Sequence, residues 1–120
     1  MNLLDTVRKG PNFENSALRA LPVDHGENRV RSVPNAVFVR VQPTPVQSPR
    51  MVLASHEAFE LLELPKELIK QNPQCPNAHN ELVLYLAGNK IWPGSEPSAH
   101  CYCGHQFGSF VGQLGDGAVM

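Results

Sequence analysis

Residues 100–120 read HCYCGHQFGSFVGQLGDGAVM and contain two cysteines, two histidines and five glycines. Asp116 stands between Gly115 and Gly117, with apolar residues on both sides of this triplet. An Asp-Gly dipeptide in such a setting is a strong signal for a β-hairpin, because both central residues of a type I′ turn need positive φ. We therefore expect a glycine-rich hairpin that turns at 115–117, with strands at 107–114 and 118–120.

The same glycines allow a ligand to approach the backbone closely. Gly115 and Gly117 can also point successive N–H groups at a phosphate. The pattern is neither a Walker loop, which needs Gly-Lys-Ser or Gly-Lys-Thr, nor a Rossmann fingerprint that opens a helix. Taken alone, it leaves a plain hairpin and a phosphate-binding turn equally open.

The cysteines and histidines of this stretch raise a metal site as an alternative. If residues 101–105 are extended, Cys101, Cys103 and His105 share one face of the strand, and Cys75 or His79 offers a fourth zinc ligand. Structural zinc sites favour Cys-x₂₋₄-Cys turns, however, and the chain has no second pair with that spacing. We expect no metal here and interpret the cysteines as small packed residues. No motif selects a histidine to activate a cysteine nucleophile.

Charge and hydropathy exclude several classes of partner. Ten basic and eleven acidic residues give a net charge of −1, so neither nucleic acid nor an anionic membrane is an expected partner. No apolar run approaches the roughly 20 residues of a membrane-spanning helix. The number of cysteines is odd, and two of them are separated by one residue, which favours a reducing compartment.

The rest of the chain is divided by eleven prolines into short segments. Residues 1–34 predict an extended arm with one short turn of helix. Residues 35–42 (NAVFVRVQ) alternate as in a strand. Ser55 is a good N-cap for a short helix that stops at Pro65 and turns Phe59, Leu61 and Leu62 inward. Residues 80–87 are apolar without a clear period, but Asn77 as a cap and Gly88 as a stop favour helix over strand.

Four stretches together carry a family resemblance. They are NSALRALPVD (15–24), VRVQPTPVQSPRMV (39–52), LAGNKIWPGSEPSAHCYCGH (86–105) and HQFGSFVGQLGDG (105–117). In this order the chain resembles the N-terminal part of the selenoprotein O family from about Asn15 to Met120. The Cys-Tyr-Cys run looks like that of the animal members, whereas bacterial members tend to carry small residues there.

This resemblance implies a protein-kinase-like fold whose members bind ATP with magnesium and transfer AMP to hydroxyl side chains of proteins. It assigns Gly115, Asp116 and Gly117 to the glycine-rich hairpin over the nucleotide. Many bacterial members carry an arginine directly afterwards, where this chain has Ala118, so a side-chain contact to phosphate must come from elsewhere. The partners implied are ATP and protein substrates, with no nucleic acid and no membrane.

The resemblance also implies that the chain is an N-terminal fragment. The expected fold class is α+β, with an arm at 1–34 and a partial kinase-like N-lobe at 35–120 that ends in the glycine-rich hairpin. All catalytic residues are then expected beyond residue 120. Animal members are mitochondrial, although MNLLDTVRKG is not typical of a transit peptide. The alternative function is a small non-catalytic binding module, metal-stabilised through Cys101, Cys103 and His105.

Overall fold

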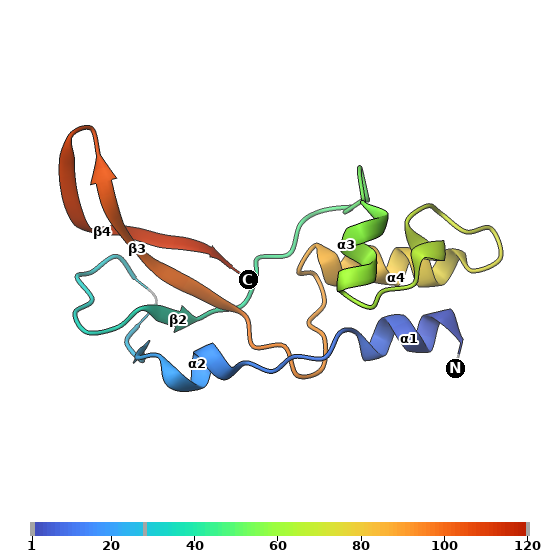
Figure 1. The fold of residues 1–120 in the computed structure, drawn as a ribbon, viewed down its shortest axis with the longest axis horizontal. Coiled ribbons are helices and arrows are strands. Elements are labelled where there is room, and N and C mark those ends of the chain that lie inside the picture. The colour runs from blue at the N-terminus through green and yellow to red at the C-terminus, as the bar shows by residue number, and fades with distance from the viewer. Residues whose placement is uncertain (1, 28, 120) are drawn as a thin grey trace. The chain divides into compact units, whose positions relative to one another are not determined.

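The structure is a computed structural model that describes residues 2–27 and 29–119. It combines helices with one sheet, as the expected α+β class requires (Figure 1). In chain order the elements are α1 (Leu3–Lys9), α2 (Ser16–Ala20), β1 (Val23–Asp24), β2 (Phe38–Arg40), α3 (His56–Leu61), the 3₁₀ turn η1 (Lys66–Leu68), α4 (Pro76–Leu86), β3 (Ser98–Gln106) and β4 (Ser109–Val119).

The chain forms two compact units. The first unit comprises Met1–Phe13 and Thr44–Ser95, and the second comprises Glu14–Pro43 and Glu96–Met120. This division differs from the boundary expected at residue 34, because the first 34 residues contribute α1 to one unit and α2 and β1 to the other. The first unit holds α1, α3, η1 and α4, and the second holds α2 and the sheet.

Helix α1 lies where the sequence analysis expected extended chain, so that expectation was wrong for these residues. The side chain of Asn2 caps the helix by accepting a 2.8 Å hydrogen bond from the Asp5 amide. Gly10 ends it with φ 69°, in the left-handed region that glycine tolerates. Val7, on the buried face of α1, is completely inaccessible to solvent.

Helix α3 begins where it was predicted. The hydroxyl of Ser55 accepts a 3.0 Å hydrogen bond from the Ala58 amide, and Phe59 is buried. The inward orientation predicted for Leu61 and Leu62 was wrong, because their exposed fractions are 85% and 46%. At about 3.6 residues per turn, Leu61 lies nearly opposite Phe59 on the helix.

Helix α4 confirms the helical interpretation of residues 80–87 and starts earlier than expected. Pro76 occupies the first turn and Cys75 is the N-cap, in place of the predicted Asn77. Gly88 follows the helix with φ 74°. Leu82 and Ala78 of α4 join the core of the first unit, whose buried members are Val7, Phe59, Leu64, Leu68, Ala78 and Leu82.

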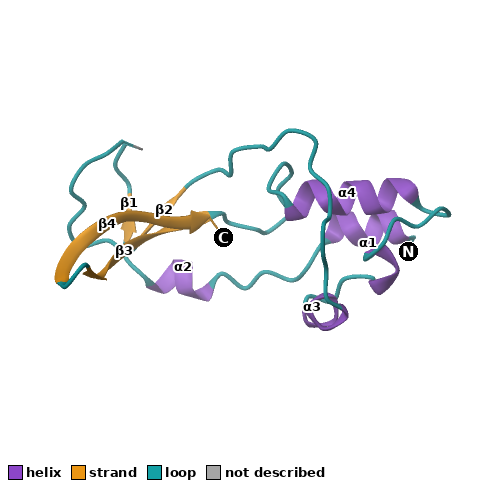
Figure 2. Ribbon diagram, turned by 90° about the horizontal axis from the view of Figure 1, so that it is seen from above, coloured by secondary structure: helices purple, strands orange, loops and turns teal. Residues whose placement is uncertain are grey.

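Helices α1 and α4 lie side by side (Figure 2), and Trp92 connects them. Its indole N–H donates a 2.7 Å hydrogen bond to the carbonyl of Val7. The ring stacks on Tyr85 of α4, with 5.0 Å between centroids and 4° between planes. One residue therefore satisfies a backbone acceptor of α1 while packing against α4.

The sheet of the second unit has the strand order β1-β2-β3-β4. β1 and β2 are parallel, and the remaining pairs are antiparallel. The predicted strand at 35–42 is confirmed over its central residues. Phe38 is its buried side chain, opposite His100 of β3 in the register, whereas Val37 is exposed.

The hairpin of β3 and β4 turns at a different place from the one predicted. Phe107 and Gly108 connect the two strands with φ 51° and φ 81°, the two positive φ angles of a type I′ turn. The predicted turn at 115–117 was wrong, because these residues lie inside β4 and pair with β3. Residues 118–119 accordingly continue β4 and do not begin a new strand.

Candidate functional site

The glycine-rich hairpin holds all three residues that the sequence analysis assigned to a ligand. Gly115 lies opposite Tyr102, and Asp116 lies opposite Cys101. Gly117 is the next residue of β4, between Asp116 and Val119, which pairs with Ala99. All three residues are thus part of β4, in the half of the strand that is farther from the turn at Phe107.

The backbone of β4 is irregular at these glycines. Two steps along β3, from Ala99 to Cys101, face three steps along β4, from Val119 to Asp116. Two further steps, from Tyr102 to Gly104, face four steps, from Gly115 to Val111. Such β-bulges leave backbone groups of the longer strand unpaired and bend it, and they are frequent beside active sites. Gly115 and Asp116 are paired with β3, so Gly117 is the one of the three that lies within a bulge and can offer backbone groups to an anion.

Two arginines elsewhere in the second unit form ion pairs. Arg31 bonds Asp24, and Arg40 bonds Glu96 at 2.9 Å. The hydrogen bond from Arg31, followed by that from the Gly26 amide, lowers the pKa of the Asp24 carboxyl. Both arginines are thus engaged in ion pairs that hold loops against the sheet.

The structure does not bring together the residues of the alternative metal site. Cys101 is half-buried on β3, Cys103 and His105 are exposed, and the ring of His105 meets Phe110 edge to face at 5.2 Å. Within residues 2–27 and 29–119, no three His, Cys, Asp or Glu side chains come together as metal ligands would. The suggested fourth ligands lie in the first unit, where Cys75 caps α4 and Nδ1 of His79 is 2.8 Å from the carbonyl oxygen of Leu68.

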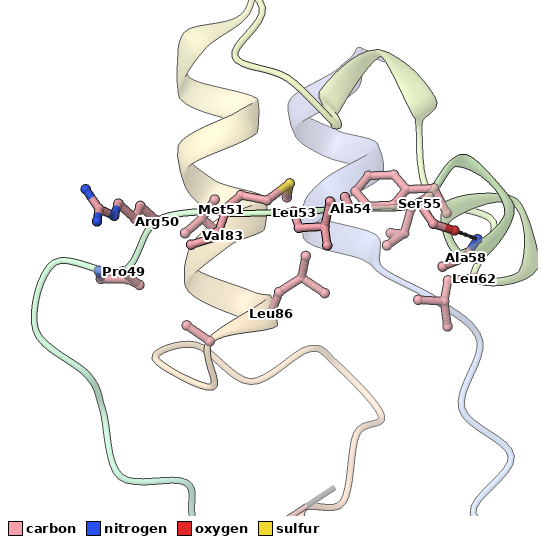
Figure 3. A pocket seen from close by; sticks show the side chains of 14 residues that line it. Pro49, Arg50, Met51, Leu53, Ala54, Ser55, Ala58, Leu62, Val83 and Leu86 are labelled. Atoms are coloured by element: carbon pink, nitrogen blue, oxygen red, sulfur yellow. Dashed lines mark hydrogen bonds between the residues drawn. The ribbon is translucent and has the colours of Figure 1, made fainter.

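A cavity that the sequence analysis did not anticipate lies in the first unit. It has a volume of about 730 Å³ and is mostly apolar. Residues 49–55, which we call the strap, cross it between α4 and α3 (Figure 3). Met51, Leu53 and Ala54 of the strap line the cavity together with Val83 and Leu86 of α4 and with Leu62, the C-cap of α3. No periodicity signals such a site, because an irregular segment forms one wall.

A second cavity of about 570 Å³ shares the first four residues of the strap, Pro49 to Val52. Its lining adds Lys70, His79 and Asn80, and it is more polar than the first cavity.

Among the helices that the structure describes, none is long and apolar enough to cross a bilayer.

Comparison with known proteins links the chain to one family. Residues 21–120 match the family model described as protein adenylyltransferase SelO. The chain is 49% identical over 118 residues to the human "Protein adenylyltransferase SelO, mitochondrial", covering 92% of this chain and 17% of the human protein. It is 51% identical over 108 residues to "Protein adenylyltransferase SelO-1, mitochondrial" of Danio rerio, covering 89% and 15%.

A bacterial relative is similar over nearly the same region. The "Protein nucleotidyltransferase YdiU" of Methylobacillus flagellatus is 48% identical over 109 residues, which cover 90% of this chain and 20% of that protein. The chain therefore spans about a fifth or less of the length of the curated relatives that it matches. The region matched by the family model includes the candidate residues at 115–117.

Proposed function

Because the chain belongs to the protein adenylyltransferase SelO family, we propose that it is part of an enzyme that transfers AMP from ATP to hydroxyl side chains of Ser, Thr or Tyr in proteins. The names of the human and bacterial relatives support this activity. In the proposal the sheet belongs to a protein-kinase-like N-lobe, and β3–β4 is its glycine-rich hairpin. Of the first 34 residues, α1 belongs to the helical unit, whereas β1 lies at the edge of this sheet.

The proposed role of Gly115, Asp116 and Gly117 is to approach the phosphates of ATP through the backbone. In AMP transfer the acceptor oxygen attacks the α-phosphorus, the bond to the pyrophosphate breaks, and the hydroxyl proton passes to a base. Catalysis of this kind depends mainly on positioning and on neutralising charge. The carrying observation is the bulge in β4 between Asp116 and Val119, which places Gly117 outside the regular ladder.

Other parts of the reaction require residues outside this chain. ATP and magnesium are the proposed cofactors, and bound magnesium would neutralise charge on the phosphates. The described residues form no cluster suited to a metal, so we assign no magnesium ligand to them. We propose that the catalytic residues follow residue 120 in the longer enzyme and that the 120-residue chain alone is inactive.

The proposed location is the mitochondrion. The human, zebrafish and mouse relatives all carry this location in their names. Protein substrates are the proposed partners besides ATP.

The experiment that tests the assignment uses the longer enzyme with Gly117→Val. We expect weaker ATP binding by calorimetry, because the branched side chain occupies space that a phosphate would approach. Gly112→Val on the same strand is the matched control, since a Cβ at Gly112 meets no atom within 4 Å. Urea unfolding of both variants separates loss of affinity from loss of folding.

Two results would contradict the proposal. Unchanged ATP affinity in a folded Gly117→Val enzyme would remove Gly117 from the site. Failure of the wild-type longer enzyme to transfer labelled AMP to any protein, itself included, would remove the activity.

A further inference from the structure

The apolar cavity under the strap opens onto a surface that is itself apolar. Val52 and Leu53 of the strap have exposed fractions of 87% and 89%, and Leu62 and Leu86 at the cavity wall are each about half exposed, at 46%. We call these four residues, with the cavity beneath them, the strap groove. Contiguous apolar surface of this kind marks a site of interaction more often than isolated exposed residues do.

Positive charge lies at one end of the strap groove. Arg50 stands at the end of the strap beyond Met51 (Figure 3), and Lys70 lines the adjoining cavity. Neither cavity has an aspartate or glutamate in its lining. Within residues 2–27 and 29–119, neither Arg50 nor Lys70 has a carboxylate at salt-bridge distance. An occupant that carries a carboxylate at this end would complement both cations.

The groove also has the form that receives a helix. Side chains of α3 and of α4 form its walls, with the strap between them (Figure 3). A third helix can lay an apolar face into such a groove through residues spaced three and four apart. A helix with leucine-like side chains on one face and an acidic residue at one end fits both the shape and the charge.

We propose that the strap groove is the docking site for an acidic amphipathic helix from the part of the longer enzyme that follows residue 120. This inference rests on the proposed function, in which the chain is one part of a longer polypeptide. The relatives support an occupant in the same polypeptide, because at least four-fifths of their length lies outside the region matched here. The groove then belongs to the internal packing of the enzyme, and the helix covers Val52 and Leu53.

The test places Leu53→Glu in the longer enzyme and in the 120-residue chain. A glutamate on a surface covered by a helix loses hydration, so we expect a lower thermal midpoint in the longer enzyme. In the 120-residue chain, where Leu53 faces water, we expect no loss. Val30→Glu is the matched control, because Val30 is as exposed as Leu53 and lies in the second unit.

Hydrogen exchange gives a second measurement that does not depend on a variant. Amides of the strap and of α3 should exchange more slowly in the longer enzyme than in the 120-residue chain. In the longer enzyme, Arg50→Glu should make these amides exchange faster again, because it places a negative charge beside the acidic residue of the docked helix.

Three outcomes would overturn the proposal. Self-association of the 120-residue chain in sedimentation, abolished by Leu53→Glu, would assign the groove to a second copy of the chain. In the longer enzyme, equal thermal midpoints for Leu53→Glu and wild type are expected only if no internal helix covers the groove. Equal midpoints, together with equal amide exchange of the strap in the longer enzyme and the 120-residue chain, would therefore mean that the occupant is a separate protein. An equally large loss from Val30→Glu removes its specificity. The AMP-transfer assay is independent, so an inactive but Leu53-sensitive enzyme would refute only the proposed function.

Discussion

Gly10 ends helix α1 directly against the indole of Trp92. A Cβ built on Gly10 would lie 2.4 Å from Cδ1 of that ring, and the backbone has φ 69°. We expect Gly10→Ala to destabilise the first unit, because the substitution adds both a steric clash and left-handed strain. The strain alone costs about 1–3 kcal/mol, and the clash with a packed ring adds to it.

Gly94→Ala separates these two effects. Gly94 has φ 82°, but a Cβ there meets nothing within 4 Å. Urea unfolding of both variants should give a smaller loss of unfolding free energy for Gly94→Ala than for Gly10→Ala. Equal losses would mean that the indole moves aside without cost.

Single residues also show where sequence reasoning was sufficient and where it was not. Asn2 as a cap and Gly10 as a stop are standard helix signals, so α1 could have been predicted from them. The contact between Gly10 and Trp92 has no such signal, because it joins residues far apart in the sequence. The same holds for the strap groove, whose wall is an irregular segment.

The hairpin turn offers a test at the level of one element. Phe107 is a non-glycine residue at φ 51°, and its side chain is fully exposed. Asparagine tolerates this region much better than phenylalanine, and Asn-Gly is the preferred type I′ pair. We therefore expect Phe107→Asn to stabilise the hairpin by up to about 1 kcal/mol, seen as slower hydrogen exchange of β3 and β4 amides.

Phe107→Ala is the control for this substitution. It removes the ring but keeps a residue that is disfavoured at positive φ, so it should not slow exchange. Faster exchange in Phe107→Asn would mean that the exposed ring contributes more to the hairpin than the backbone strain costs.

The elements differ in how far local sequence determined them. α3 was predicted from Ser55 because the cap acts within one turn of chain. The position of the hairpin turn was not predicted from local sequence. Both Phe107-Gly108 and Asp116-Gly117 could form the turn, and the local rule favours Asp-Gly. Pairing of β4 along the whole of β3 prevailed, with bulges taking up the extra residues. The family resemblance assigned Gly115, Asp116 and Gly117 to the site, but it did not predict that they lie inside β4.

For the molecule as a whole, the clearest pH dependence involves Glu81. Its Oε1 accepts hydrogen bonds from Nζ of Lys90 at 2.8 Å and from Nε of Arg8 at 3.3 Å. The bond from Lys90, followed by that from Arg8, lowers the pKa of the Glu81 carboxyl below its ordinary value. Since the folded pKa is the lower one, this contribution to stability is present above the unfolded pKa and is lost as the pH falls through the folded pKa.

We expect the unfolding free energy to fall with acidification below about pH 4.3, the ordinary value for glutamate. Glu81→Gln should be less stable than wild type at pH 7 and should lose less on acidification, because it lacks this ionisable group. Chemical unfolding from pH 7 to pH 3 measures both slopes. Glu67→Gln is the control, since Glu67 has no ion pair among the described residues. Parallel curves for Glu81→Gln and wild type would contradict the prediction.

The chain passes between its two units three times, at residues 13–14, 43–44 and 95–96, and this path has a consequence for synthesis on the ribosome. A nascent chain emerges from its N-terminus, so α1 appears long before α4 and β2 long before β3. β1 and β2 have two and three residues and are too short to form a stable sheet by themselves. The first unit can close once Ser95 has emerged, whereas the second must wait for the hairpin. Co-translational folding therefore completes the helical unit before the glycine-rich strands form.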